Sequence, residues 1–91
     1  MVYRIDYTVE AFNDIIALQK SDPKAYAKVQ RLIEELKAHP RTGTGHPEQL
    51  KGDRAGQWSR RITQKHRLVY TITDNEVLVL VLAAYGHYGD R

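Results

Sequence analysis

The sequence contains no cysteine among its 91 residues, and this absence excludes several kinds of site. Neither a disulfide framework, nor a thiolate nucleophile, nor a thiolate metal site can form. Long apolar runs are also missing. The longest, Val77 to Ala84, is well short of the roughly 18 residues that a membrane-spanning helix needs. The N-terminus carries no apolar signal segment, so we expect a soluble cytoplasmic protein without a membrane partner.

A chain of this length is predicted to form one domain, residues 1–91, around a modest core. The net charge of +3 is small, but it is unevenly distributed. The segment from Pro40 to Arg67 holds seven Lys and Arg residues against two Asp and Glu residues. Such a basic segment indicates a polyanionic partner, and a solvated charged loop explains it equally well.

Two amphipathic helices are predicted in the first half of the chain. Alternation from Tyr3 to Thr8 predicts a half-buried strand, and Thr8 can cap a helix that follows. Asp22 and Pro23 then favour the start of a second helix, which we expect to run to about Lys37. The predicted buried stripe of the first helix is Phe12, Ile15, Ile16 and Gln19. The predicted stripe of the second is Tyr26, Val29, Leu32, Ile33 and Leu36.

The second half is predicted to be a loop followed by three strands. Pro40 to Gln57 is rich in Gly, Pro and Thr and is expected to be irregular; loops of this length are often functional. Two strands follow within Trp58 to Tyr70, and a last strand from Val77 to about Tyr85 is apolar on both faces, as in a central strand. The order β-α-α-β-β-β predicts an α+β fold in which a helical hairpin covers one face of a small, twisted, mostly antiparallel sheet.

Arginines alternate with apolar residues on the two strands that follow the loop. Because strand side chains change face at every residue, Trp58, Arg60 and Ile62 are predicted to share one face. Arg61 and Arg67 are then predicted to meet on the face that lacks the large apolar side chains. Two fixed guanidinium groups suit a phosphodiester.

Besides these two arginines, Glu48 in the loop and the pair His87 and Tyr88 are candidates for chemistry. A nuclease that uses the 2′-hydroxyl of RNA as nucleophile needs a base, fixed cations and an acid. Glu or His can be the base, and His or Tyr the acid. The chain lacks a carboxylate cluster and histidines at ligand spacing, so we expect no metal and no other cofactor.

The sequence also leaves structural interpretations open for these residues. An isolated loop carboxylate such as Glu48 is usually solvated, and His87 and Tyr88 can belong to a frayed tail. Arg60 and Arg61 can simply be surface charges.

Three further residues have such interpretations. Arg67 can form an exposed ion pair with Glu76 or Asp74, and such pairs contribute little. His66 is expected at a turn or a strand edge. Trp58 leads the apolar face and is therefore expected to anchor the core rather than to stack on a base.

Three stretches of the sequence resemble YoeB-type toxins of the RelE superfamily, the toxic halves of bacterial toxin–antitoxin pairs. They are Gly43 to Lys51 with its Pro-Glu-x-Leu-Lys core, Trp58 to Tyr70, and His87-Tyr88. The family consists of small ribosome-dependent mRNA endonucleases that cut the codon exposed in the ribosomal A site. The resemblance therefore implies a RelE-like fold and a metal-independent endoribonuclease activity that inhibits translation.

The resemblance also implies roles for individual residues. Glu48 would act as general base and His87 as general acid, while Arg67 would stabilise the charged transition state. Tyr88 would position or stack the RNA.

The same resemblance implies phosphate-binding roles for Lys51 and Arg61, and a set of partners. These are the ribosomal A site with its 16S and 23S rRNA, the mRNA, and a YefM-like antitoxin whose C-terminal segment wraps the toxin. Operator DNA is expected to be bound only through the antitoxin, and a homodimer is expected as well.

Two other function classes stay open from the sequence. One is a non-catalytic protein of the same fold that serves as antitoxin partner and co-repressor, or as an RNA-binding module. The other is a ParE-like inhibitor of DNA gyrase. The combination of Glu48, Arg67 and His87 favours the endonuclease, because the gyrase-directed branch does not need that set.

Overall fold

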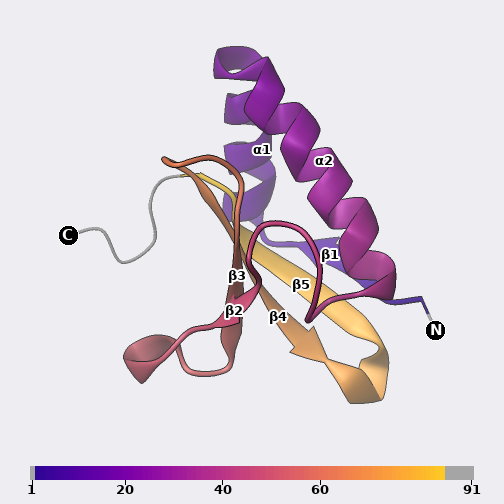
Figure 1. The fold of residues 1–91 in the computed structure, drawn as a ribbon. Helices are drawn as coiled ribbons and strands as arrows, with labels where there is room; N and C mark the ends of the chain where they lie inside the picture. Colours follow the sequence, from indigo (N-terminus) through magenta and orange to yellow (C-terminus); the bar gives the residue numbers. More distant parts are fainter. Residues whose placement is uncertain (1, 86–91) are drawn as a thin grey trace.

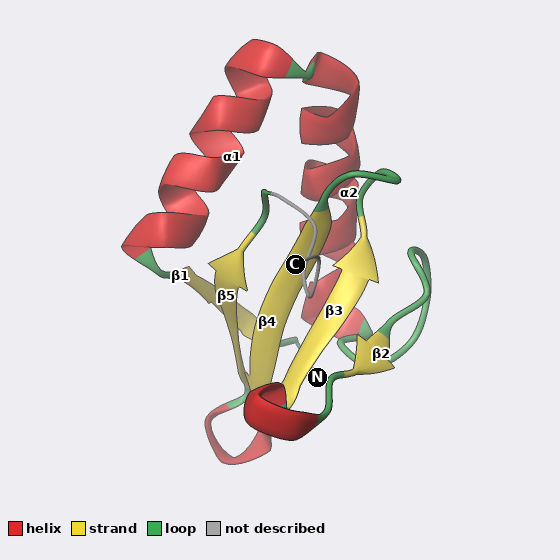
Figure 2. Ribbon diagram, turned by 90° about the vertical axis from the view of Figure 1, so that its left-hand side faces the viewer, coloured by secondary structure: helices red, strands yellow, loops and turns green. Residues whose placement is uncertain are grey.

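Five strands form one sheet in residues 2–85, the part of the chain that the computed structural model describes. The strand order is β1-β5-β4-β3-β2, and Figure 2 shows the strands side by side in this order. The elements in chain order are β1 (Arg4–Tyr7), α1 (Val9–Ser21), α2 (Pro23–Ala38), β2 (Glu48–Gln49), a 3-10 turn η1 (Gly52–Arg54), β3 (Gln57–Arg61), β4 (Arg67–Thr73), a second 3-10 turn η2 (Asp74–Glu76) and β5 (Leu78–Ala83).

The sheet is mostly antiparallel, and the two helices lie on one side of it (Figure 1). Only β1 and β5 run parallel; β5 with β4, β4 with β3, and β3 with β2 are antiparallel. The core between helices and sheet joins Leu18 of α1 and Leu32 of α2 to Leu68, Tyr70 and Val81 of the strands. The predicted fold class is confirmed, and so is the central position of the last strand, because β5 has a neighbour on each side.

Both helices begin where the capping residues predict. The hydroxyl oxygen of Thr8 accepts a hydrogen bond from the backbone N–H of Ala11, and the carboxylate of Asp22 accepts one from Ala25. Pro23 occupies the first turn of α2, where its missing N–H leaves no helical hydrogen bond unmade. Within the described residues, neither helix is long and apolar enough to cross a membrane.

The buried face of α1 agrees only in part with the predicted one. Ile15 packs against the core as predicted, but Ala11 and Leu18 are the fully buried residues, whereas Phe12 is 57% exposed and Gln19 is also exposed. The helix presents its small residue, Ala11, to the sheet, which allows close approach, and this rotation turns Phe12 outward. In α2 the prediction holds better: Val29, Leu32 and Leu36 are buried, and Tyr26 and Ile33 are half-buried against the core.

The segment predicted to be wholly irregular contains one additional strand. Glu48 and Gln49 form β2, which pairs with Ser59 and Trp58 at the edge of the sheet. The strand comprises two residues between Pro47 and Leu50, too few for an alternating pattern to reveal. Trp58 is half-buried and packs against the core, as its place on the apolar face predicts.

Candidate functional site

The face of the sheet that looks away from the helices carries a pair of arginines. Arg61 of β3 and Arg67 of β4 are direct neighbours across the antiparallel pair. Leu68 and Tyr70, which alternate with this pair, point into the core, so Arg61 and Arg67 stand on the opposite face. Neither helix covers this face, which we call the open face, although Ser59 and Val69 are buried in it. Arg61 is exposed, and a guanidinium N–H of Arg67 lies 3.4 Å from the hydroxyl oxygen of Ser59. The register therefore brings the two arginines together as the alternation predicts.

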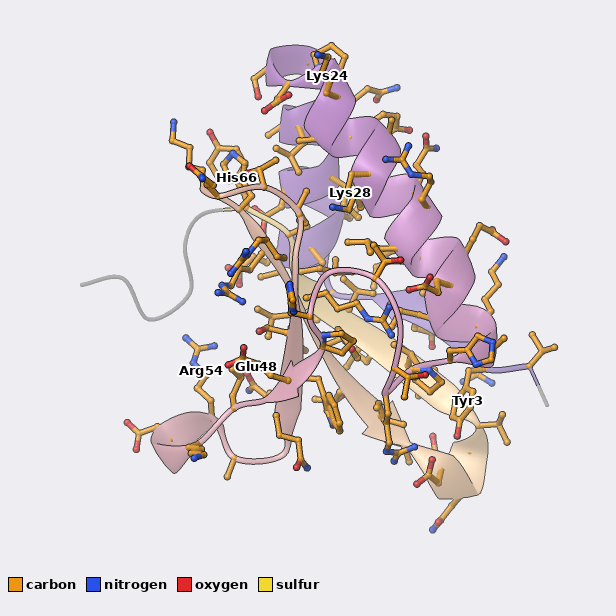
Figure 3. All side chains as sticks on the ribbon, in the orientation of Figure 1. Tyr3, Lys24, Lys28, Glu48, Arg54 and His66 are labelled. Atoms are coloured by element: carbon orange, nitrogen blue, oxygen red, sulfur yellow. The ribbon has the colours of Figure 1, made fainter. Side chains whose placement is uncertain are left out.

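Glu48 reaches the same face from β2. Its pairing partner is Ser59, and directly opposed residues of an antiparallel pair point to the same side of a sheet. Ser59 is also the residue that Arg67 contacts. In Figure 3, Glu48 lies on the side of β3 away from α2, with Arg54 of η1 nearby. The carboxylate of Glu48 and the guanidinium of Arg67 thus flank one serine on the open face.

Lys51 follows β2 and is exposed. Its carbonyl oxygen accepts a hydrogen bond of 3.2 Å from the N–H of Arg54 and so closes the 3-10 turn η1. Lys51 and Arg54 are therefore basic residues that leave the same edge of the sheet as Glu48. In residues 2–85 no three side chains of the His, Cys, Asp and Glu types gather in a way that could hold a metal ion.

Arg60 is not the surface charge that one interpretation of the sequence allowed. It is completely buried, and its guanidinium donates five hydrogen bonds of 2.5 to 3.2 Å. The acceptors are the hydroxyl of Tyr70, the carboxylate of Glu35, and the carbonyl oxygens of His39, Thr42 and Thr44. A buried cation is tolerated only with such compensation, which the loop between α2 and β2 supplies here. The sequence signal for the burial of Arg60 is its place on the predicted strand face that also carries Trp58 and Ile62.

Glu35 completes this network from α2. Its carboxylate accepts hydrogen bonds from the backbone N–H and the hydroxyl of Thr44 as well as from Arg60. Partial burial raises the pKa of this carboxyl. The hydrogen bonds from Thr44 and the contact with Arg60 lower it by more, so the pKa of Glu35 lies below its ordinary value of 4.5. Glu35 is therefore ionised at neutral pH and ties the loop to α2.

Two glycines let this loop approach β3 closely. Gly45 has φ +88°, and its carbonyl oxygen accepts a 2.7 Å hydrogen bond from the N–H of Arg61. A Cβ atom at Gly45 would lie 2.9 Å from the carbonyl oxygen of Arg61, and one at Gly43 would meet the carboxylate of Glu35. Only glycine fits both this backbone conformation and this spacing.

An ion pair between Arg67 and Asp74 is not formed, and that interpretation is wrong. Asp74 instead accepts 2.8 Å hydrogen bonds from Arg41 and from the hydroxyl of Tyr3. The reason is distance along β4: Arg67 begins the strand and Asp74 follows its end. Among the described residues Glu76, in the same turn as Asp74, forms no ion pair with Arg67 either.

Ala84 and Tyr85, which follow β5, are held in place near the start of β4. The ring of Tyr85 stacks on His66, with 4.6 Å between the ring centroids, and the N–H of Ala84 donates to the carboxylate of Asp14. His66 lies directly before β4, at the strand edge where it is expected, and is nearly buried. His87 and Tyr88 lie outside the described residues.

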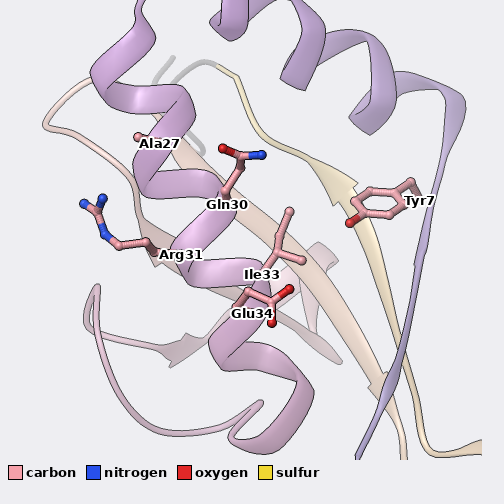
Figure 4. A pocket seen from close by; sticks show the side chains of 6 residues that line it. All are labelled: Tyr7, Ala27, Gln30, Arg31, Ile33 and Glu34. Carbon is pink, nitrogen blue, oxygen red and sulfur yellow. The ribbon is translucent and has the colours of Figure 1, made fainter.

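A shallow hollow between β1 and α2 is separate from all of these residues (Figure 4). It lies along β1, at the opposite edge of the sheet from β2. It is lined by Tyr7, Ala27, Gln30, Arg31, Ile33 and Glu34. None of the predicted site residues within the described part of the chain faces it, so the candidate site is the open face around Glu48, Arg61 and Arg67.

Comparison with known proteins identifies close relatives over nearly the whole chain. Residues 7–88 match the model of a family described as YoeB-like toxin of bacterial type II toxin–antitoxin systems. A curated relative, Toxin YoeB of Streptomyces coelicolor, is 46% identical over 93% of this chain and 99% of its own length.

Two solved structures from Staphylococcus aureus have the same fold. A chain of the YoeB dimer superposes with a TM-score of 0.83 at 34% identity, and a chain of the YoeB–YefM complex with 0.81 at 31% identity. Each comparison covers 97% of this chain and 100% of the other.

Proposed function

Since the chain belongs to the YoeB-like toxins of bacterial type II toxin–antitoxin systems, we propose that it is a ribosome-dependent mRNA endonuclease. The observation that supports this proposal is the convergence on one open sheet face of a carboxylate, Glu48, and two guanidinium groups, Arg61 and Arg67. A base and fixed cations are two of the three requirements for cleavage by the adjacent 2′-hydroxyl, and the third, an acid, is proposed to be His87.

In the proposed reaction, Glu48 takes the proton of the 2′-hydroxyl, and the 2′ oxygen attacks the adjacent phosphorus. The bond from phosphorus to the 5′ oxygen breaks, and His87 donates a proton to that leaving oxygen. The products are a 2′,3′-cyclic phosphate and a 5′-hydroxyl, so no water is consumed in this step, and the step is proposed to proceed without a metal. Arg67 stabilises the charge that builds on the phosphoryl oxygens.

RNA is proposed to cross the open face along its basic residues. Arg61 is exposed beside Arg67, and Lys51 leaves the edge of the sheet next to Glu48, so both can bind phosphates that flank the scissile one. Tyr88 is proposed to stack on or position the RNA. The ribosomal A site with its rRNA is the proposed location of the reaction.

A YefM-like antitoxin is the proposed protein partner, because the Staphylococcus aureus relative forms a YoeB–YefM complex. Operator DNA would be bound through that antitoxin. A homodimer is part of the proposal as well, since the same organism supplies a YoeB dimer.

The test is single-turnover cleavage of mRNA on programmed ribosomes with mapped products. Glu48→Gln and His87→Gln are expected to abolish most cleavage. Arg67→Ala is expected to slow it by about 10² to 10³-fold, the loss of one transition-state donor. Glu10→Gln and Lys20→Ala, which alter exposed charges of α1, serve as matched controls and should cut like wild type.

The same set of proteins separates the other function classes. If wild type and the Glu48→Gln variant arrest growth equally, the catalytic assignment is wrong. Inhibition of gyrase supercoiling by wild type would support a ParE-like activity. A protein that binds antitoxin tightly, but leaves both mRNA and gyrase unaffected, would be a co-repressor.

A further inference from the structure

Arg60 is the one charged side chain that is fully buried among the described residues. It links the core of the fold to the loop before β2. We propose that Arg60 is a positioning residue for Glu48: it fixes the loop of residues 39–45 and thereby the register and direction of β2. This inference rests on the proposed function, because it assigns Arg60 a role in presenting the proposed general base.

The hydrogen bonds of Arg60 go mainly to the loop. The guanidinium makes five of them, and three of the acceptors are the backbone carbonyls of His39, Thr42 and Thr44. The other two, Tyr70 and Glu35, themselves bind the loop, through the carbonyl of Pro40 and through Thr44. Every one of these partners of Arg60 therefore either belongs to the loop or holds it.

The middle of the loop has little else to keep it in place. Pro40 is buried at the start of the loop, but residues 41–44 are all exposed and bury no apolar side chain that would anchor them. Apart from Arg60 and Glu35, the loop is held by the hydroxyl of Tyr70, which donates to the carbonyl oxygen of the buried Pro40, by Arg41 with Asp74, and by the carbonyl oxygen of Gly45, which accepts from the N–H of Arg61. Because ordering a residue costs backbone entropy, which residues 41–44 do not offset by apolar burial, the hydrogen bonds of Arg60 are needed to hold this conformation.

Glu48 depends on that conformation because β2 is so short. Two residues pair with β3, and the contact before them is the hydrogen bond from Arg61 to Gly45. Ser59 and Arg61, the neighbours of Arg60, thus hold β2 and the residue before it through backbone contacts. Arg60 holds the preceding loop through its side chain, on the face of the sheet that the helices cover. A shift of the loop would move Glu48 relative to Arg67 by a comparable distance.

The experiment compares wild type with Arg60→Lys, which keeps the positive charge but cannot reach five acceptors. Tyr70→Phe is the milder second variant, since it removes only one acceptor of Arg60 and the bond to Pro40. Leu18→Ala in α1 is the matched control, because it creates a buried cavity remote from the loop. Unfolding free energy, amide hydrogen exchange of the free protein, and the ribosomal cleavage rate are measured for each.

We expect Arg60→Lys to slow single-turnover cleavage by about 10- to 100-fold, as a displaced catalytic group does, with half-saturating ribosome concentration within about twofold of wild type. Amides of residues 41–49 should exchange at least about tenfold faster, while those of β4 and β5 keep their protection. Tyr70→Phe should show the same pattern to a smaller extent. Leu18→Ala should lower the unfolding free energy but change neither the cleavage rate nor the relative exchange of residues 41–49.

Equal rates for Arg60→Lys and Leu18→Ala at matched stability would overturn the proposal. So would unchanged exchange in residues 41–49 of both loop variants. If wild type fails to cut mRNA while the exchange pattern appears as expected, the endonuclease assignment fails but the dependence of β2 on Arg60 stands.

Discussion

Arg60 and Arg61 are adjacent residues of the same type with opposite environments. Arg60 is completely buried and Arg61 is exposed, because consecutive strand side chains point to opposite faces. A one-residue slip of β3 could bury Arg61 in place of Arg60, but it would also turn Trp58 and Ile62 away from the core. The apolar residues on either side of Arg60 therefore specify the register of β3, and the five acceptors require an arginine at the buried position between them.

Glu35 makes the loop contact dependent on pH. Its folded-state pKa lies below the ordinary value of 4.5, so its ionised form stabilises the folded protein. The sign follows from linkage: this stability is complete above pH 4.5 and is lost as pH falls through the lower, folded-state pKa. Glu35→Gln is expected to lower the unfolding free energy by about 1–2 kcal/mol at pH 7, the contribution of one charge-assisted hydrogen bond.

Urea denaturation at pH 7 and at several values below the ordinary carboxyl pKa tests this expectation. The difference in unfolding free energy between wild type and Glu35→Gln should become steadily smaller as the pH is lowered through the acidic values. Glu34→Gln is the matched control, since the neighbouring Glu34 is exposed and pairs with Lys37 on the helix surface. A constant difference at every pH would contradict the assignment.

At the scale of elements, β2 is a strand that its own sequence hardly supports. Glu48 and Gln49 are polar and exposed, and two residues cannot bury an apolar face. The strand exists because the hydrogen bond from Arg61 to Gly45 and the pairing with Ser59 bring it alongside β3. The tight approach at Gly45 is therefore a condition for β2.

Gly45→Ala is expected to lower the unfolding free energy by about 1–3 kcal/mol, from a strained positive φ and a 2.9 Å contact between the new Cβ and the carbonyl of Arg61. Gly56→Ala is the matched control, because Gly56 has a similar φ of +95° and a Cβ added there would meet nothing within 4 Å. The two variants share the backbone strain, so the difference between them in a urea titration reports the steric contact. Equal losses of unfolding free energy in the two variants would mean that the loop moves away from β3 without an energetic cost.

Most elements and the arginine face of this chain were predictable from sequence. Alternation places Arg61 and Arg67 on one face, and capping chemistry places the helix starts at Thr8 and Asp22. These features depend on local spacing, which a sequence displays directly.

Features that depend on tertiary contacts were not predictable in the same way. The burial of Arg60 requires three loop carbonyls that no periodicity reveals, and the outward rotation of Phe12 follows from how Ala11 meets the sheet. The catalytic and RNA-binding roles of Glu48, Arg67 and His87 stay predictions, as do those of Tyr88, Lys51 and Arg61.

At the scale of the whole molecule, the sheet separates two kinds of surface. One face is covered by α1 and α2, and the other carries the basic and acidic side chains of the candidate site. The helices contribute their own charges on the far side, where Arg31 lines the hollow beside β1. Charge on the open face is thus available to a polyanion without interference from the helical surface.

Binding of a short single-stranded RNA should therefore weaken with salt, and Arg61→Ala should reduce the log–log slope by about 0.7, the effect of one lost phosphate contact. Arg31→Ala is the matched control and should leave the slope unchanged. Fluorescence anisotropy between roughly 50 and 300 mM salt, a range in which counterion release is measurable, provides the reading. Equal slopes for wild type and Arg61→Ala would remove Arg61 from the RNA path.

The parallel pairing of β1 with β5 also has a consequence for how the molecule comes into being. Arg4 to Tyr7 pair with Leu78 to Val81, so the first strand cannot complete the sheet until these distant residues have been synthesised. Such sequence-distant closure gives the chain a high contact order and places sheet completion late in folding. A nascent chain in which Leu78–Ala83 has not yet emerged therefore lacks the strand that joins β1 to β4, and its sheet stays incomplete during translation.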